Sequence, residues 1–62
     1  MTEFTAKQKM DAADREVKQR MRVYPRLIEA GKMTKEKAEY ETDIMRAIAA
    51  DYHPLALKER LL

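Results

Sequence analysis

The apolar residues in the first half of the chain recur every three or four positions, the spacing that places side chains on one face of a helix. Thr5 and Gln8 have the spacing of a capping box, which begins a helix. Gly31 would end it in the left-handed conformation that glycine tolerates best. We therefore predict a helix over about residues 6–30. Its apolar stripe is Met10, Ala13, Val17, Met21, Tyr24 and Ile28.

Pro25 lies inside this predicted helix without disturbing the phase of the apolar stripe. Proline removes the hydrogen bond to the Met21 carbonyl and disfavours the helical conformation of Tyr24, at a cost of about 3 kcal/mol in a regular helix. Two outcomes fit the pattern. The helix is continuous and kinked at Pro25, or it breaks after Val23 and Pro25 opens a second short helix. Because the phase is uninterrupted, we favour the kinked helix.

A second helix is predicted over about residues 35–52, with Thr34 as its N-cap. His53 precedes Pro54, and a residue before proline is biased away from the helical conformation, so we expect the helix to stop there. The tail 54–62 would form a short C-terminal helical segment. The stripe of the second helix is Ala38, Glu41, Ile44, Met45, Ile48 and Tyr52.

Two helices joined by a few residues pack as an antiparallel hairpin. The sequence therefore predicts an all-α fold, a single small helical domain over residues 1–62. Folding the chain at Gly31 sets a register of facing residues: Tyr24 with Ala38, Met21 with Glu41 and Ile44, Val17 with Met45, Ala13 with Ile48 and Ala49, and Met10 with Tyr52. The same register brings a basic row opposite an acidic row: Lys18, Arg22 and Arg26 opposite Asp43, Glu39 and Glu36.

Composition argues against most catalytic and metal chemistry. With no cysteine and the single histidine His53, the chain lacks the usual ligands of a zinc site. Carboxylates spaced like Glu36, Glu39 and Asp43 usually face water, and His53 suits the end of a helix. We expect no cofactor, no metal and no enzymatic activity. No apolar run reaches the roughly 20 residues of a membrane span, and the first residues lack the apolar core of a signal peptide, so we expect a cytoplasmic protein.

The distribution of charge leaves a partner surface open. Residues 15–37 carry eight Lys and Arg against three acids, whereas residues 39–51 carry four acids against one Arg. We favour a basic face that pairs with the acidic row or faces water; the alternative is a surface for an anionic partner, including nucleic acid. Arg20 lies outside the paired row and Tyr40 lies off the stripe. The candidate partner-binding residues are Arg20, Tyr40, Arg22 and Arg26.

Several apolar residues have no place on the predicted stripes. Val23 and Leu27, one turn apart, form a second edge on the first helix and are the candidate self-association residues. Either the tail folds back over this edge to give a three-helix monomer, or a second copy covers it to give a four-helix dimer. We favour the dimer because a nine-residue tail is short for this task. The remaining unplaced residues are Phe4, Tyr40, Leu55, Leu57, Leu61 and Leu62.

Three segments, MTEFTAKQKMDAADREVK, VYPRLIEAGKMTKEKAEYE and MRAIAADY, give the chain a family resemblance over about residues 1–53. The sequence resembles small conserved early proteins of lambda-type bacteriophages, encoded between the exonuclease and excisionase genes. The resemblance implies a cytoplasmic protein of the infected host, associated with lytic development and interference with the host cell cycle, and it transfers no catalytic residue. We therefore expect a non-enzymatic accessory protein that binds a host or phage protein. The alternative is a nucleic-acid-associated regulator that uses the basic helix face.

Overall fold

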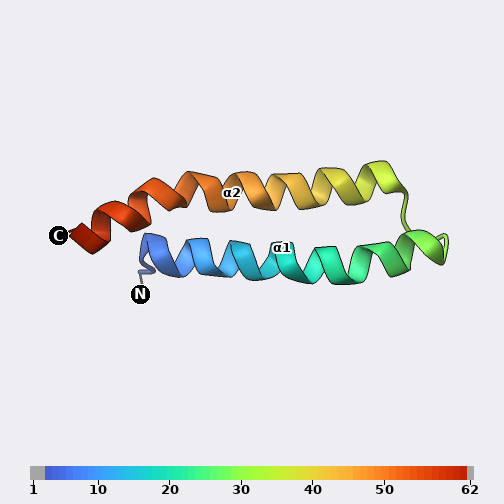
Figure 1. The fold of residues 1–62 in the computed structure, drawn as a ribbon, viewed down its shortest axis with the longest axis horizontal. Helices are drawn as coiled ribbons and strands as arrows, with labels where there is room; N and C mark the ends of the chain where they lie inside the picture. Colours follow the sequence, from blue (N-terminus) through green and yellow to red (C-terminus); the bar gives the residue numbers. More distant parts are fainter. Residues whose placement is uncertain (1–2, 62) are drawn as a thin grey trace.

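The computed structural model describes residues 3–61, which form two antiparallel helices joined by a short turn (Figure 1). Helix α1 spans Ala6–Glu29 and helix α2 spans Lys35–Leu61. The all-α hairpin predicted from the sequence is confirmed. The molecule is long and thin, with extents of 47 × 22 × 17 Å, so the two helices form one layer with two broad faces.

The N-terminus of α1 is fully capped. The Thr5 hydroxyl accepts a hydrogen bond from the Gln8 N–H, and the Gln8 side chain accepts one from the Thr5 N–H, which confirms the predicted capping box. The N–H groups of Ala6 and Lys7 instead donate to the Glu59 carboxylate from the far end of α2. All the backbone donors that the first turn of a helix leaves without an internal partner are therefore satisfied.

The turn between the helices is closed by Gly31, whose φ of +73° is in the left-handed region. The Gly31 N–H donates to the Ile28 carbonyl and the Lys32 N–H donates to the Leu27 carbonyl. This pair of bonds is the Schellman arrangement that commonly ends helices. Thr34 then caps α2, because its hydroxyl accepts a hydrogen bond from the Lys37 N–H at 3.1 Å.

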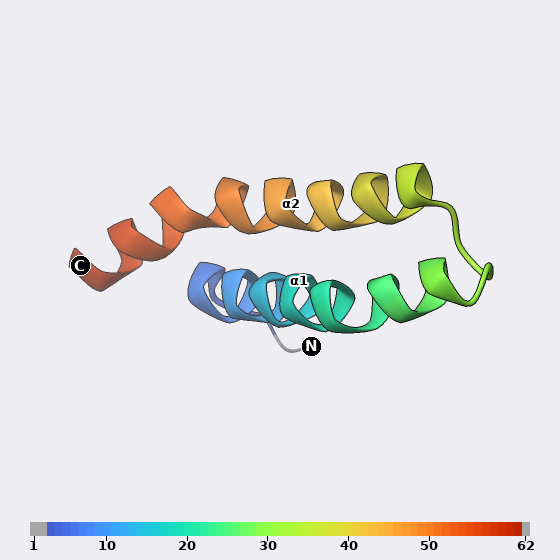
Figure 2. The ribbon, with the colours of Figure 1, turned by 45° about the vertical axis from the view of Figure 1, so that its right-hand side comes forward.

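Both prolines lie inside helices. α1 is continuous through Pro25, so the alternative of a break after Val23 is wrong. The prediction that the second helix ends near residue 52, with a separate short segment over 54–62, is also wrong: α2 continues through Pro54 to Leu61. Figures 1 and 2 both show the red C-terminal part of α2 inclined to the rest of the helix and projecting beyond the start of α1. Leu62 lies outside the described residues.

Tertiary contacts explain why α2 does not stop at Pro54. The turns after the proline bury Ala56 and bring Glu59 to the backbone of Ala6 and Lys7. The burial and the two hydrogen bonds offset the hydrogen bond that a proline removes from a helix. The prediction weighed only the local preference of His53 and could not include these contacts.

The seam between the helices is built from alanine. Larger side chains on the seam are half-buried, and they repeat at seven-residue intervals: Met10, Val17 and Tyr24 on α1, and Met45 and Tyr52 on α2. A seven-residue repeat is typical of helices that wrap around each other as in a coiled coil. Small residues between the larger ones let the two backbones approach closely. The buried residues of the segment 3–61 are Ala6, Ala13, Ala38, Ala49 and Ala56.

The predicted register agrees with the contacts, but the predicted stripe is partly wrong. The Lys9 ammonium lies 5.3 Å from the centre of the Tyr52 ring. The predicted register pairs Met10, the residue after Lys9, with Tyr52, so this contact agrees with it. Met21, Ile44 and Ile48, however, are exposed to solvent. The seam follows the buried alanines of α2. At about 100° per residue, Ile48 lies about 100° around the helix from Ala49, and Ile44 lies further in the same direction, so both lie to one side of the seam.

The predicted pairing of the basic and acidic rows is wrong. Lys18, Arg22 and Arg26 are exposed. A step of two residues turns a helix by about 200°, so Arg22 and Arg26 lie on the opposite side of α1 from Tyr24 in the seam. Among the described residues, each ion pair instead joins two residues of one helix: Lys7 with Asp11, Lys37 with Glu41, and Asp43 with Arg46.

Candidate interaction surface

Two contacts across the seam distinguish the broad faces of the hairpin. The Lys9 ammonium over the Tyr52 ring marks one face. The Arg46 guanidinium, which donates to the Met21 sulfur at 3.4 Å, marks the other. Leu27 follows Lys9 by 18 residues, which is about five helical turns, so it lies on the Lys9 side of α1.

The face marked by Lys9 and Tyr52 is named here the isoleucine face. Ile44, Ile48 and Leu55 of α2 are 42%, 38% and 50% exposed, and their helical positions lie within an arc of about 40°. Together with the half-buried Tyr52 they make an unbroken apolar row on successive turns. Val23 and Leu27 of α1, both half-buried, lie on the same side of the hairpin. Large apolar side chains thus follow most of the length of one broad face.

Phe4 extends the isoleucine face at its N-terminal end. Its side chain is 62% exposed, and it lines a surface hollow together with Tyr52 and Leu55. Lys9, Lys58 and Glu59 border the same hollow. The apolar row therefore ends in an aromatic group with charged neighbours, an arrangement common where an apolar surface meets its polar rim.

The opposite broad face, named here the methionine face, carries Met10, Met21, His53 and Leu57. Three hollows on this face are lined by these residues together with charged side chains. On α2 the successive turns along this face are Asp43, Arg46, Ala50, His53 and Leu57. Charge interrupts this row, whereas the row on the isoleucine face is continuous.

Arg20 lies at the edge of the seam between the helices. Its side chain is half-buried, and its Nε donates a hydrogen bond to the Tyr24 hydroxyl at 3.0 Å. Its Nη1 is buried and has no hydrogen-bond partner among the described residues. Arg20 was a candidate partner-binding residue; its half-buried side chain lies at the edge of the seam, and its role in binding a partner stays a prediction.

The other candidate partner-binding residues are exposed but are not brought together. Tyr40 is 62% exposed and lies about 200° around α2 from the buried Ala38, so it points away from α1. Arg22 and Arg26 lie on the outer side of α1, away from α2. The tyrosine and the two arginines therefore lie on opposite outer edges of the hairpin, separated by its width.

Sequence reasoning missed Ile44, Ile48 and Leu55 as surface residues. It assigned the isoleucines to the seam and left the leucine in a separate tail. One signal was available: Ala38, Met45 and Tyr52, like Ala49 and Ala56, repeat at seven residues, whereas the step from Ile44 to Ile48 is four. A seven-residue repeat on α2 would have placed the alanines, and not the isoleucines, against α1.

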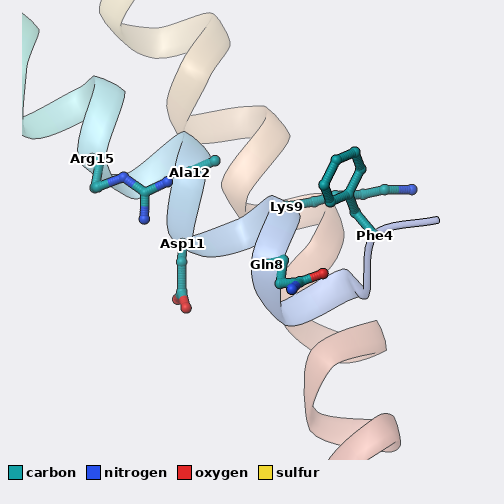
Figure 3. Close-up of a pocket in the computed structure, with 6 residues that line it drawn as sticks. All are labelled: Phe4, Gln8, Lys9, Asp11, Ala12 and Arg15. Atoms are coloured by element: carbon teal, nitrogen blue, oxygen red, sulfur yellow. The ribbon is translucent and has the colours of Figure 1, made fainter. Parts of the chain in front are cut away.

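A further hollow lies on the outer side of α1 and is drawn in Figure 3. Its lining comes from α1 and from Phe4, which precedes that helix. Figure 3 shows the charged side chains of Asp11 and Arg15 projecting outward from the helix. A hollow lined from one helix is open to solvent and does not enclose a ligand. The lining residues are Phe4, Gln8, Lys9, Asp11, Ala12 and Arg15.

Residues 3–61 contain neither a candidate membrane span nor a candidate metal-binding cluster. Neither α1 nor α2 has a stretch long and apolar enough to span a bilayer. Within the same residues, no three His, Asp or Glu side chains are grouped so that they could hold a metal ion.

Comparisons of this chain with known protein families, with curated proteins and with solved structures found no match.

Proposed function

We propose that this chain is a non-enzymatic interaction protein whose isoleucine face binds another protein chain. The observation that carries the proposal is the exposure of Ile44, Ile48 and Leu55 along a hairpin in which the buried residues, among those the structure describes, are all alanine. In most small domains the largest apolar side chains fill the core. Here they lie outside it, on one broad face, where a partner helix has access to them.

The energetics favour such a partner. Burial of apolar surface contributes about 25 cal/mol per Å², and full burial of one leucine or isoleucine contributes about 1.5–3 kcal/mol. The seam of the hairpin gains only part of this, because its buried side chains are alanines and its larger side chains are half-buried. Residues in a continuous row on successive turns present the spacing that a helix-in-groove interaction requires.

The proposed setting follows from the sequence resemblance. As an early accessory protein of a lambda-type bacteriophage, the chain would act in the bacterial cytoplasm and promote lytic development by binding a host or phage protein. The isoleucine face supplies a surface for that role, and the exposed Tyr40 lies at its outer edge.

Affinity capture with two matched double variants tests this proposal. Ile44→Lys with Ile48→Lys places two charges on the isoleucine face, whereas Leu57→Lys with Leu61→Lys places two charges elsewhere on α2, at side chains that are equally or more exposed. We expect the first variant to lose the proteins captured by the wild type from infected cells and the second to retain them. Equal capture by both variants would refute the proposal. Far-UV circular dichroism checks that each variant is helical.

A second candidate function rests on the basic outer side of α1. Lys18, Arg22 and Arg26 are exposed at four-residue intervals, and none of them joins an ion pair within residues 3–61. A row of free cations suits a phosphate backbone. Titration with duplex DNA at 50 and 200 mM salt tests this function. Three phosphate contacts predict an affinity loss of roughly 40-fold between the two salts. Arg22→Gln with Arg26→Gln should weaken the binding and flatten its salt dependence.

A further inference from the structure

We infer that a second copy of this chain covers the isoleucine face, so that two hairpins form a four-helix dimer. The inference rests on the proposed function, because it names the occupant of the same face. A heterologous partner would then bind in competition with self-association. Three features carry the inference: the surface area of the hairpin, the dimensions of the face, and the contrast between the two faces.

The surface area of the hairpin exceeds that of a compact protein of its size. A folded monomer of 7.3 kDa is expected to expose about 4,200 Å². This chain exposes 5297 Å². The excess of about 1,100 Å² is similar to the roughly 800 Å² that each partner buries in a standard protein interface. One interface on one face therefore accounts for the excess.

The dimensions of the face fit a second hairpin. The broad face measures about 47 × 22 Å. An occupant that covers it must be an elongated two-helix layer of similar length, or a larger surface with a matching groove. A second copy has the same length, the same width and the same apolar row, so two isoleucine faces related by a two-fold axis cover each other completely.

The contrast between the faces decides which one is used. The row Ile44, Ile48, Tyr52 and Leu55 has no charged member. The charged residues of this face border the row: Lys9, Lys58 and Glu59 at one end, and the Lys37–Glu41 ion pair at the other. Burying the methionine face would enclose Asp43 and Arg46, and enclosed charges are costly unless each is well paired. Their Nη1 to Oδ1 distance of 3.5 Å is long for a bidentate pair. Association through the isoleucine face therefore buries an uncharged row, whereas the row on the methionine face contains Asp43 and Arg46.

Sedimentation equilibrium of the purified protein over a hundredfold concentration range tests the inference. We expect the mass to approach twice 7.3 kDa at high concentration. Ile44→Lys with Ile48→Lys should keep the mass near that of one chain, whereas Leu57→Lys with Leu61→Lys should behave as the wild type. A constant single-chain mass for the wild type would overturn the inference, as would a dimer that only the second pair of changes disrupts.

A thiol experiment remains decisive if the charged variant fails to fold. The chain has no cysteine, so a single introduced cysteine is the only thiol. Leu55 and Leu57 are 50% and 48% exposed in the hairpin and lie on opposite faces. With Leu55→Cys, the rate of alkylation should fall at least tenfold as the concentration rises through the dimer transition, and with Leu57→Cys it should not change. Equal rates at every concentration would overturn the inference.

The two proposals fail in different ways. A wild type that stays monomeric, while the isoleucine variant still loses its captured partner, refutes the dimer and keeps the interaction function. A wild type that stays monomeric, together with partner capture that Ile44→Lys and Ile48→Lys leave unchanged, refutes both proposals.

Discussion

The Glu59 carboxylate near the end of α2 accepts a hydrogen bond from the backbone N–H of Ala6 at the start of α1, over 2.8 Å and a separation of 53 residues. Its second oxygen accepts from the Lys7 N–H at 3.3 Å. α1 has no acidic residue in its own first turn. Glu59 therefore supplies from the other helix the negative charge that the positive end of the helix dipole favours.

Replacing Glu59 with alanine should lower the free energy of unfolding by about 1 kcal/mol, within the range of 0.5–2 kcal/mol measured for the loss of a helix cap. Glu16 provides the control, because its side chain is exposed in the middle of α1. Glu16→Ala should change stability by less than about 0.5 kcal/mol. Urea unfolding at one fixed protein concentration measures both. Equal effects of the two changes would contradict a capping role for Glu59.

Pro54 and Glu59 should be energetically coupled. The C-terminal part of α2 is inclined to the rest of the helix (Figure 2), and Glu59 in this part reaches the backbone of Ala6 and Lys7 at the start of α1. Pro54→Ala restores a helical hydrogen bond but straightens this part of α2. In that background the loss from Glu59→Ala should shrink to under half of its value in the wild type. A double-mutant cycle measures the coupling, and strictly additive effects would show that the bend does not position the carboxylate.

The neighbouring residues Ala49 and Ala50 should respond differently to the same enlargement. Ala49 is buried in the seam and Ala50 is exposed. Ala49→Leu should destabilise the protein by about 1–3 kcal/mol, because extra carbon atoms force the helices apart. Ala50→Leu should remain within about 0.5 kcal/mol of the wild type. Thermal unfolding followed by circular dichroism distinguishes them, and a tolerated leucine at residue 49 would contradict the close approach of the helices.

Gly31→Ala should destabilise the hairpin by about 1–2 kcal/mol. The cost is conformational, because the φ of +73° is unfavourable for a residue with a Cβ atom. Crowding does not contribute, since a Cβ added at Gly31 would have no atom within 4 Å. Gly31→Asn is the matched comparison and should lose less, because asparagine tolerates this conformation better. If asparagine and alanine were equally destabilising in urea, the backbone explanation would fail.

Arg20→Met should leave stability unchanged or raise it by up to about 1 kcal/mol. The change removes the buried Nη1 that has no partner, and methionine retains much of the apolar length of the side chain. Tyr24→Phe should instead lose about 1 kcal/mol, because the Arg20 Nε then lacks its acceptor. Chemical denaturation tests the pair. A loss above 1 kcal/mol for Arg20→Met would show that the guanidinium contributes net stability.

The start of each helix and the turn between them could be predicted from the sequence. The capping box of Thr5 and Gln8, the left-handed Gly31 and the cap at Thr34 are local features, and local hydrogen bonding is enough to specify them. The continuity of α1 through Pro25 followed from the unbroken apolar phase. The bend expected at Pro25 stays a prediction.

The side of each helix that faces the other, and the end of α2, could not be predicted, because both depend on contacts between the helices. The choice between Ala49 and Ile48 for the seam depends on how closely two helices approach, which local spacing does not fix. The passage of α2 through Pro54 depends on Glu59 reaching Ala6, a contact between the two ends of the chain. Stability that comes from residues distant in sequence outweighs a local preference of a few kcal/mol, and for that reason the isoleucine face became visible only when both helices were placed together.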